Sequence, residues 1–548
     1  MPTVPIRNQH SSAAAFGRVA LALAICFGAA SCARHVRQDD VGEVDLLIKG
    51  GTVVDGTGAA SRVADVGLRG DRIAFVGDAA TSNVTAARTL DATGLVVAPG
   101  FIDPHTHTTG DLSSAERHAN LDYLMQGVTT VVTGNDGSSP LNIGEEFAQW
   151  TRGGIGPNAA LFIGEGSVRL KVMGMSDAKP TAAQIDSMRS LVARGMRDGA
   201  LGLSSGLYYA PGSYASTEEV VQLAKVAASY GGIYDTHMRD ESSYNVGLVG
   251  AVDEAIRIGR EAGIPVHISH IKALGVDVWG ESDTVIALID SARAAGVQVA
   301  ACQYPYTASG TSIGASLLPR WAEAGGRDSL LERMRDSATR ARLETDMREN
   351  LRKRGGAEAL LITSRDDTTL TGKTLAQVAT ERKLSPIEAA LEIVKNGDAG
   401  VASFNMKESD IDNFMVQPWV ATCSDGSAGH PRKYGTFPRK LREYVYNRHV
   451  LTLEQAVHVS SGLTARILHL DSRGSLAPGK YADVIVFDPN TVRDRATYEE
   501  PRLLATGMRY VFVNGKIAID EGEYTGALPG RVLKRESTKN ESASTKTR

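Results

Sequence analysis

The stretch Val-Val-Ala-Pro-Gly-Phe-Ile-Asp-Pro-His-Thr-His, residues 96–107, opens the central part of this chain. Val96 to Asp103 form an apolar run, which predicts a buried strand. The run is followed at once by His105 and His107. Because alternate residues of an extended segment point the same way, the two imidazoles would lie on one side of the chain and could hold one cation.

Seven further apolar runs follow, separated in most cases by stretches rich in Ala, Glu, Arg and Leu that are typical of helices. The runs are Val128 to Thr133, Ala159 to Gly164, Ala200 to Ser204, Gly232 to Thr236, Pro265 to Ser269, Val297 to Gln303 and Trp419 to Ser424. Alternating strands and helices predict a parallel sheet in an α/β fold. Eight strands favour a (β/α)8 barrel of the TIM type over an open sheet.

Both ends of the chain carry a different pattern, in which short strands are separated by turn residues. Residues 45–95 and 474–530 are therefore predicted to build one small β-sandwich domain, and the barrel would occupy residues 96–473. More than a hundred residues separate the seventh and eighth strands, so residues 307–417 are predicted to be an inserted cap. The polar residues 533–548 predict a disordered tail.

The first 31 residues have the order of an export signal, because arginines precede an apolar run from Val19 to Ala30. The run is too short to span a bilayer comfortably. It ends in Ala29-Ala30-Ser31-Cys32, which resembles a bacterial lipobox with alanine in place of leucine. Residues 1–31 are predicted to be a lipoprotein signal, with export to the periplasm and anchoring to the outer membrane through Cys32. An ordinary cleaved signal is the alternative.

Composition limits the class of protein. The chain has 548 residues, 42% of them hydrophobic, which is enough for a large core. Its net charge of −4 lacks the basic excess of a duplex-binding protein, so nucleic acid is not expected as a partner. The four cysteines show no CxxC spacing and no disulfide framework. Cys302 and Cys423 are expected to be buried as small hydrophobic residues.

In (β/α)8 barrels the active site forms where the strands end. The polar residues that close the predicted strands are His105, His107, Asp136, Glu165, His237, His270, Tyr304 and Asp425. An isolated His-x-His is a weak signal for metal. However, His237 and His270 lie 33 residues apart, about one βαβ unit, so they would point to the same place. With the carboxylates they supply nitrogen and oxygen donors suited to Zn²⁺ or a similar divalent ion.

Several of these segments match motifs of a known family. The motifs are Pro99-Gly-Phe-Ile-Asp-Pro-His-Thr-His107, Thr236-His-Met-Arg239, Ile268-Ser-His-Ile-Lys272, Ser424-Asp-Gly426, His430-Pro-Arg432, Gly435-Thr-Phe-Pro-Arg439 and Pro478-Gly-Lys-Tyr-Ala-Asp483. From about Asp45 to Pro529 the chain resembles the N-acyl-D-amino-acid deacylases, or D-aminoacylases, of the amidohydrolase superfamily. The first and last motifs are found across the superfamily, whereas those containing Lys272 and Gly435 to Arg439 point to the deacylases.

The resemblance implies hydrolysis of the amide bond of N-acyl-D-amino acids, which gives a carboxylate and a free D-amino acid. It implies one or two Zn²⁺ ions, with His237 and His270 holding the tighter ion and the His105 and His107 pair forming a weaker second site. Asp425 matches the catalytic aspartate.

The resemblance also implies a substrate that is a small molecule carrying a carboxylate. The groups that would hold this carboxylate are Lys272, Tyr304 or Tyr306, and Arg432. Cations and a hydroxyl suit this task because they fix the orientation of an anion. His430 follows Asp425 closely enough to reach the site, with a structural role in its loop as the equal alternative.

Two positions depart from the family's pattern. Asp136 stands where the family commonly has a zinc-binding cysteine, in Gly134-Asn-Asp-Gly137. A carboxylate can bind or bridge metal ions but is a harder donor than a thiolate, so the number of bound ions and the metal preference are left open. Glu165 stands where the family's pattern has histidine, which is consistent with a divergent subgroup.

Three other functions stay open on sequence alone. One is a dipeptidase that acts on peptides containing a D-residue. Another is a cyclic-amide hydrolase of the dihydroorotase or hydantoinase type, which usually bridges two metals with a carboxylated lysine; the end of the fourth strand, Gly202 to Gly206, offers none. The last is a non-catalytic binding scaffold on the same fold.

Overall fold

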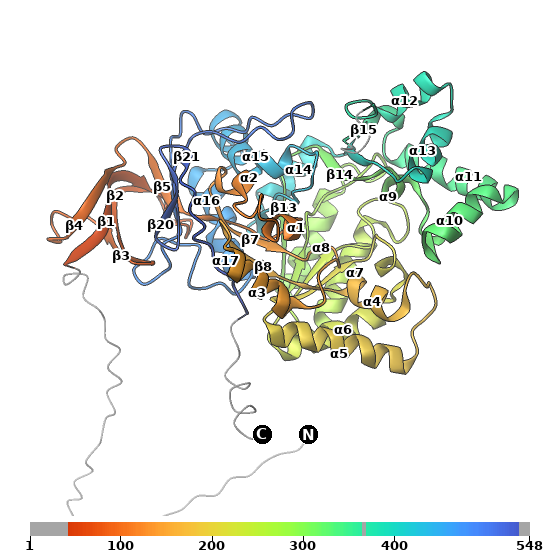
Figure 1. The fold of residues 1–548 in the computed structure, drawn as a ribbon, viewed down its shortest axis with the longest axis horizontal. Helices are drawn as coiled ribbons and strands as arrows, with labels where there is room; N and C mark the ends of the chain where they lie inside the picture. Colours follow the sequence, from red (N-terminus) through yellow and green to blue (C-terminus); the bar gives the residue numbers. More distant parts are fainter. Residues whose placement is uncertain (1–41, 364–368, 536–548) are drawn as a thin grey trace, which may run out of the picture. The chain divides into compact units, whose positions relative to one another are not determined.

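The computed structural model describes residues 42–363 and 369–535 (Figure 1). The predicted signal peptide, Cys32 and residues 536–548 of the predicted tail lie outside the described residues, so these assignments stay predictions. Within the described ranges, no helix has both the length and the apolar character needed to cross a bilayer.

One nine-stranded sheet combines strands from both ends of the chain, coloured red-orange and dark blue in Figure 1. Its strands are β1 (Glu43–Val53), β2 (Arg62–Arg69), β3 (Arg72–Gly77), β4 (Thr85–Asp91), β5 (Val96–Pro99), β18 (Val484–Phe487), β19 (Met508–Val513), β20 (Lys516–Asp520) and β21 (Glu523–Tyr524). The order is β21-β20-β19-β18-β5-β1-β2-β3, with β4 paired to β1. β5 joins the two ends, because it pairs with β1 on one side and with β18 on the other.

The predicted first strand, Val96 to Asp103, is divided in the structure. It breaks at Gly100 into β5 and β6 (Phe101–Asp103), which belong to different sheets. A Cβ atom on Gly100 would lie 2.7 Å from Cβ of Thr129 and closer still to the rest of that side chain, so only glycine allows this close approach. The prediction of one continuous strand was therefore wrong, and only Phe101–Asp103 belongs to the central strands.

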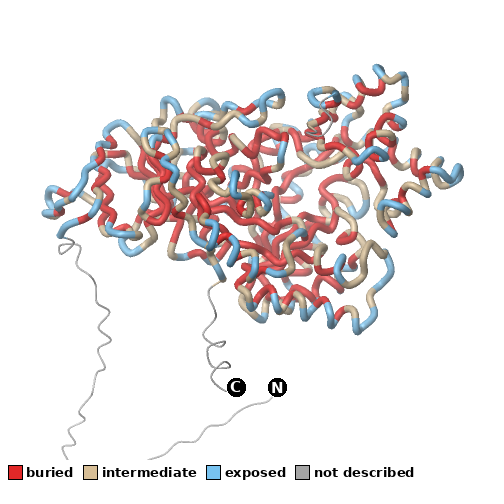
Figure 2. The backbone as a smooth tube through the Cα atoms, in the orientation of Figure 1, coloured by how far each residue is buried: buried red, intermediate tan, exposed pale blue. Residues whose placement is uncertain are grey.

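The central strands are parallel and form two sheets. One has the order β6-β7-β8, with β7 at Val128–Thr133 and β8 at Asn158–Leu161; the other has the order β9-β10-β11-β12-β13-β17. Its strands are β9 (Ile163–Gly164), β10 (Gly202–Gly206), β11 (Ile233–His237), β12 (Val266–Ile268), β13 (Val299–Gln303) and β17 (Val420–Thr422). Ala300 is their only residue that is not buried, which explains why they read as continuous apolar runs (Figure 2).

The two parallel sheets are joined at both sides, by a one-residue link in the chain and by a backbone bridge. Phe162 alone separates β8 from β9. At the other side, Thr106 and Gly426 form a parallel bridge, and the amide of Asp425 donates to the carbonyl of His105 at 3.0 Å. The segment that carries the His-x-His pair therefore lies directly beside the segment that carries Asp425.

Helices follow most of the central strands. They are α1 (Thr109–Leu112), α2 (Leu121–Leu124), α3 (Ile143–Gly153), α4 (Glu165–Met173), α5 (Ala182–Asp198), α6 (Thr217–Ser229), α7 (Gly247–Ala262), α8 (Ser282–Ala294), α15 (Arg432–Arg439), α16 (Leu453–Ser460) and α17 (Gly462–Ile467). The apolar side chains of all but α17 pack against the strands in one large core, and those of α17 belong to two smaller clusters. Ser216 caps α6 by accepting a hydrogen bond from the amide of Glu219, which sets where this helix begins.

The segment between β13 and β17 has a core of its own. It contains the antiparallel sheet β14-β16-β15, formed by Ala308–Ser312, Gly400–Phe404 and Leu360–Ile362. Its helices are α9 (Ile313–Leu317), α10 (Gly326–Arg335), α11 (Ser337–Lys353), α12 (Leu375–Arg382), α13 (Pro386–Lys395) and α14 (Glu408–Met415). Apolar residues such as Leu343, Leu360 and Leu391 form a cluster separate from the main core. The segment is thus a packed layer and not a simple loop.

Candidate metal centre and active site

The carboxyl ends of the central strands open into a cavity of about 500 Å³. Nine residues singled out from the sequence line it: His107, Asp136, His237, His270, Lys272, Tyr304, Asp425, His430 and Arg432. His105 is fully buried beside them. Tyr306 and Glu165 do not line the cavity.

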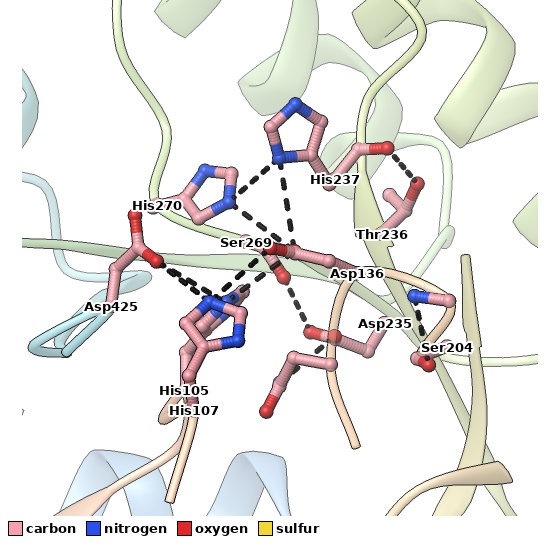
Figure 3. Close-up of polar contacts among 12 residues, drawn as sticks. His105, His107, Asp136, Ser204, Asp235, Thr236, His237, Ser269, His270 and Asp425 are labelled. Atoms are coloured by element: carbon pink, nitrogen blue, oxygen red, sulfur yellow. Dashed lines mark hydrogen bonds and ion pairs between the residues drawn. The ribbon is translucent and has the colours of Figure 1, made fainter. Parts of the chain in front are cut away.

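The histidines and carboxylates form two groups that share Asp136 (Figure 3). The ligand atoms of each group lie within 4.8 Å of one another; one group is His105, His107, Asp136 and Asp425, and the other is Asp136, His237 and His270. Oδ1 of Asp136 lies 3.4 Å from Nε2 of His105 and 3.4 Å from Nε2 of His270. A single carboxylate therefore faces both groups.

Local backbone geometry turns three of these side chains toward the cavity. Asp136, His270 and Asp425 have φ values of 54°, 35° and 47°, in or near the left-handed region. Aspartate tolerates this region, whereas the φ of His270 lies below the usual left-handed range of about 50–70° and is therefore strained. Such strain persists where the surrounding structure enforces it, and it is concentrated at functional sites.

The buried donor atoms fit a metal ion. Neither ring nitrogen of His105 has a hydrogen-bond partner among the described residues, and the same holds for Oδ1 of Asp136. Leaving such atoms without a partner costs on the order of 1–3 kcal/mol each. A divalent cation would satisfy Nε2 of His105 and Oδ1 of Asp136 together, since these atoms lie 3.4 Å apart, and a set of imidazole nitrogens and carboxylate oxygens suits Zn²⁺.

The same charges control protonation of the imidazoles when no ion is bound. Burial lowers the pKa of His107, but the carboxylates of Asp136 and Asp425 outweigh it and raise this pKa to about 9. Burial and Lys272 lower the pKa of His270, yet Asp425 and Glu241 raise it to about 10. His237 differs, because burial lowers its pKa to about 4. In the metal-free protein, His107 and His270 therefore carry protons on imidazole nitrogens that a cation would bind.

Glu241 is a buried carboxylate of this site that we did not single out from the sequence. Its Oε1 atom lies 2.6 Å from Nζ of Lys272 and 3.0 Å from Nδ1 of His270. A carboxylate against the outer nitrogen of a metal-binding imidazole fixes the orientation of the ring. The sequence did contain one sign that Glu241 could reach the site, because Glu241 follows His237 by only four residues, in the loop after β11.

Arg432 and Tyr304 lie together on the cavity wall. Nη1 of Arg432 is 2.8 Å from Oδ2 of Asp425, and the guanidinium lies 4.6 Å above the ring of Tyr304. The hydroxyl of Tyr304 is buried without a hydrogen-bond partner among the described residues. Tyr306 instead packs beneath Arg439, whose guanidinium is 4.9 Å from its ring. Of the two tyrosines, Tyr304 is therefore placed to contact a ligand.

His430 lines the cavity, but both of its ring nitrogens are engaged. Nε2 lies 3.1 Å from the carbonyl oxygen of Ala308, and Nδ1 accepts a hydrogen bond from the amide of Arg432 at 3.1 Å. Burial and the nearby Arg432 hold its pKa well below the usual value, so the ring is neutral. This geometry matches a structural role in which His430 holds the loop that carries Arg432.

Glu165 is fully buried behind the cavity wall. Neither of its carboxylate oxygens has a hydrogen-bond partner among the described residues. Burial and the neighbouring Glu219 raise its pKa to about 7, although Arg169 and Arg239 act in the opposite direction.

Cys302 and Cys423 are also fully buried, in an apolar cluster with Ala421. Burial of both cysteines as small hydrophobic residues agrees with the prediction.

Comparison with known proteins identifies the kind of site. Residues 88–519 match the model of the Amidohydrolase family. A D-aminoacylase of Alcaligenes xylosoxydans xylosoxydans is 36% identical over 527 residues, which cover 91% of this chain and 99% of that protein. An N-acyl-D-glutamate deacylase of the same organism is 35% identical, covering 90% and 98%.

Solved structures of D-aminoacylases and related deacylases are similar to this chain as well. A D-aminoacylase with a binuclear metal centre, activated by one metal and attenuated by a second, superposes with a TM-score of 0.77 at 36% identity, over 90% of this chain and 100% of that one. The N-acyl-D-glutamate deacylase of Bordetella bronchiseptica, in complex with zinc and a phosphonate mimic of the tetrahedral intermediate, gives 0.76 at 34%, with the same coverage. A D-hydantoinase gives 0.54 at 16% identity, a likeness of fold alone.

Proposed function

Since this chain belongs to the D-aminoacylase family within the amidohydrolase superfamily, we propose that it is a zinc-dependent hydrolase of N-acyl-D-amino acids. Its products are a carboxylate and a free D-amino acid. The observation that carries this proposal is the pair of ligand groups that share Asp136, with Asp425 beside them. The D configuration of the substrate rests on the relatives, which include a D-aminoacylase and an N-acyl-D-glutamate deacylase.

We also infer that the two parallel sheets form one eight-stranded (β/α)8 barrel, in which β8 and β9 count as one strand interrupted at Phe162. The bridge between Thr106 and Gly426 supports closure on one side, and the single residue between β8 and β9 supports it on the other. In this arrangement the nine-stranded sheet is the separate β domain of residues 45–95 and 474–530, to which Val96–Pro99 adds the strand β5, and residues 307–417 are the inserted cap. All strand ends then lie at one mouth, where barrel enzymes have their active sites.

His237, His270 and Asp136 would hold one zinc ion, and His105 and His107 would hold a second that shares Asp136. Bound zinc supplies Lewis acidity, which makes water nucleophilic near neutral pH and stabilises negative charge on an amide oxygen. Glu241 keeps the ring of His270 in the orientation that presents Nε2 to Asp136.

Asp425 is the proton carrier in this proposal. Burial raises its pKa, but Arg432 and the neighbouring histidines outweigh burial and hold the pKa well below its usual value, so the carboxylate is ionised. It accepts a proton from the attacking water and then delivers this proton to the amine nitrogen as the amide bond breaks. Its Oδ1 atom lies 3.1 Å from Nε2 of His107, which supports a proton transfer at the metal centre.

Lys272, Tyr304 and Arg432 orient the substrate by binding its α-carboxylate. All three line the cavity, and the hydroxyl of Tyr304 has no hydrogen-bond partner within residues 42–363 and 369–535, so it can donate to a ligand. A bidentate guanidinium and an ammonium hold a carboxylate in a defined direction, which places the amide bond for attack. Among the described residues at the end of β10, Ser204, Ser205 and Gly206 offer no lysine to bridge two metals, which disfavours the cyclic-amide alternative.

The test is a panel of N-acetyl-D-amino acids, their L enantiomers and D-containing dipeptides, assayed with and without added zinc. We expect D-specific hydrolysis that Asp425→Asn reduces by roughly 10²–10⁴-fold in kcat, because proton transfer is lost. Asp412→Asn is the control, since this aspartate lies on α14 and pairs with Arg448. Near-normal activity of Asp425→Asn would refute the assignment, and a protein that binds no zinc and hydrolyses nothing would favour a scaffold.

A further inference from the structure

Arg354 is a buried cation that the mechanism does not use. It follows helix α11 in the inserted segment, lines the cavity, and is 2% exposed. Its Nε donates to the carbonyl of Ser316 at 3.1 Å, its Nη2 to the hydroxyl of Tyr208 at 3.2 Å, and its Nη1 to Oγ of Ser403 at 3.5 Å. All of these acceptors are neutral, and no carboxylate of the described residues forms an ion pair with Arg354.

The other buried arginines differ in this respect. Among the described residues four arginines are buried, and the remaining three each have a carboxylate partner: Arg169 has Glu219, Arg432 has Asp425 and Arg473 has Asp483. A buried charge is costly unless an opposite charge and hydrogen bonds compensate for it. The C-terminal end of α11 offsets only part of this cost. Arg354 therefore lacks a counter-charge that its three counterparts have.

Two tyrosines connect Arg354 with the metal centre. The ring of Tyr208 lies 5.7 Å from the ring of His237, and the hydroxyl of Tyr208 accepts from Arg354 while it donates to the carbonyl of Ala315 at 2.8 Å. The guanidinium also lies 5.6 Å from the ring of Tyr244. The hydroxyl of Tyr244 is buried without a partner among the described residues, and both tyrosines line the cavity.

Arg354 is thus one aromatic ring beyond a metal ligand, on an element different from those that carry Lys272, Tyr304 and Arg432. The guanidinium carries five N–H groups. Three of them form the hydrogen bonds above, and Nη1 also donates to the side-chain oxygen of Asn405 at 3.3 Å, which leaves one N–H, on Nη2, for a ligand. An anion at this place would have to be several bonds away from the amide under attack.

We propose that Arg354 determines specificity by binding a second carboxylate of the substrate, remote from the scissile amide. This inference rests on the proposed function and narrows its substrate class to N-acyl-D-amino acids with two carboxylates. The second carboxylate belongs either to an acidic side chain, as in an N-acyl-D-glutamate, or to a dicarboxylic acyl group, as in an N-succinyl-D-amino acid. Tyr208 and Tyr244 would enclose the connecting methylene groups.

The experiment compares substrates that differ only in this charge. We expect the protein to favour N-acetyl-D-glutamate over N-acetyl-D-glutamine, or N-succinyl-D-alanine over N-butyryl-D-alanine, by about 100-fold in kcat/KM. The first pair reports on the side chain and the second on the acyl group. Arg354→Met should abolish the preference and leave the neutral substrates within about threefold, whereas Arg354→Lys should keep part of it. Arg352→Met is the matched control, because Arg352 lies on the exposed face of α11, just before Arg354, and pairs with Asp277.

A binding measurement separates this inference from the proposed function. Glutarate should raise the melting temperature of the zinc-loaded protein more than its monoamide does, and Arg354→Met should remove the difference. Equal behaviour of charged and neutral partners in both the kinetic and the binding assay would overturn the role of Arg354, even if D-specific hydrolysis is observed. If no N-acyl-D-amino acid is hydrolysed, the proposed function fails, and the glutarate measurement still decides whether Arg354 binds a carboxylate. Should Arg354→Met fail to fold, the substrate ratios of the unaltered protein and of Arg354→Lys decide.

Discussion

Nη1 of Arg432 lies 2.8 Å from Oδ2 of Asp425, so the cation assigned to the substrate's carboxylate also holds the carboxylate assigned to proton transfer. Both residues are buried, at 1% and 6% exposure. In a site shielded from water, this pair stabilises the ionised form of Asp425 strongly. Binding of substrate and the basicity of Asp425 are therefore linked through one guanidinium.

Replacing Arg432 by methionine should change both properties together. KM for an N-acyl-D-amino acid should rise by at least about tenfold, because one cation no longer binds the α-carboxylate. The pKa of Asp425 should rise, so the acid limb of the pH–kcat/KM profile should move to higher pH. Arg439→Met is the control, since Arg439 pairs with Asp494 outside the cavity. An acid limb that stays in place would contradict the link.

Removing the shared carboxylate should affect both metal sites. Asp136→Ala should lower the zinc content of the purified protein at both ligand groups, whereas His107→Ala should reduce it by at most one ion per chain. Asp136→Cys should keep one tightly bound ion, because a thiolate is a good zinc ligand. Metal analysis after dialysis measures all three variants. Unchanged zinc content in Asp136→Ala would show that Asp136 is not shared.

Zinc affinity should increase with pH. With pKa values of about 9 and about 10, His107 and His270 are protonated at neutral pH in the metal-free protein, and their lone pairs become available only when these protons leave. The apparent dissociation constant should therefore fall from about pH 6 to about pH 8, with release of protons on binding. Calorimetry in buffers of different ionisation enthalpy counts the protons. Affinity independent of pH would exclude proton displacement.

Stability should report the buried carboxyl of Glu165. Its pKa of about 7 lies above the usual glutamate value of 4.5. Between these two pH values the folded protein therefore holds a proton that the unfolded chain has released. The contribution of this group to the free energy of unfolding is complete below about pH 4.5 and is lost as pH rises through about 7. Glu165→Gln removes the titration and should be more stable than the parent above pH 7, by up to about 3 kcal/mol, but not below pH 4.5.

Urea unfolding at several pH values measures this difference. The exposed Glu145→Gln serves as the control, because its side chain is on the surface of α3. Equal pH dependence of Glu165→Gln and the parent protein would show that Glu165 does not titrate in this range.

Much of the secondary structure could be predicted from local pattern. β7 has the predicted bounds, Val128–Thr133. A strand buried on both faces reads as an apolar run, so this signal is local. The division of Val96 to Asp103 could not be predicted, because it depends on the contact between Gly100 and Thr129 across two strands.

The order of residues along the chain was enough to show which residue types end each central strand, and hence that nitrogen and oxygen donors for a metal ion would be present. Folding in three dimensions was needed to show that Asp136 faces both ligand groups, that Tyr304 and not Tyr306 lines the cavity, and that Glu241 pairs with Lys272. It also brought Arg354 from the inserted segment to Tyr208, 146 residues away in the chain. The reason is physical: strand and helix patterns depend on near neighbours, whereas burial and pairing of charges depend on packing between distant segments.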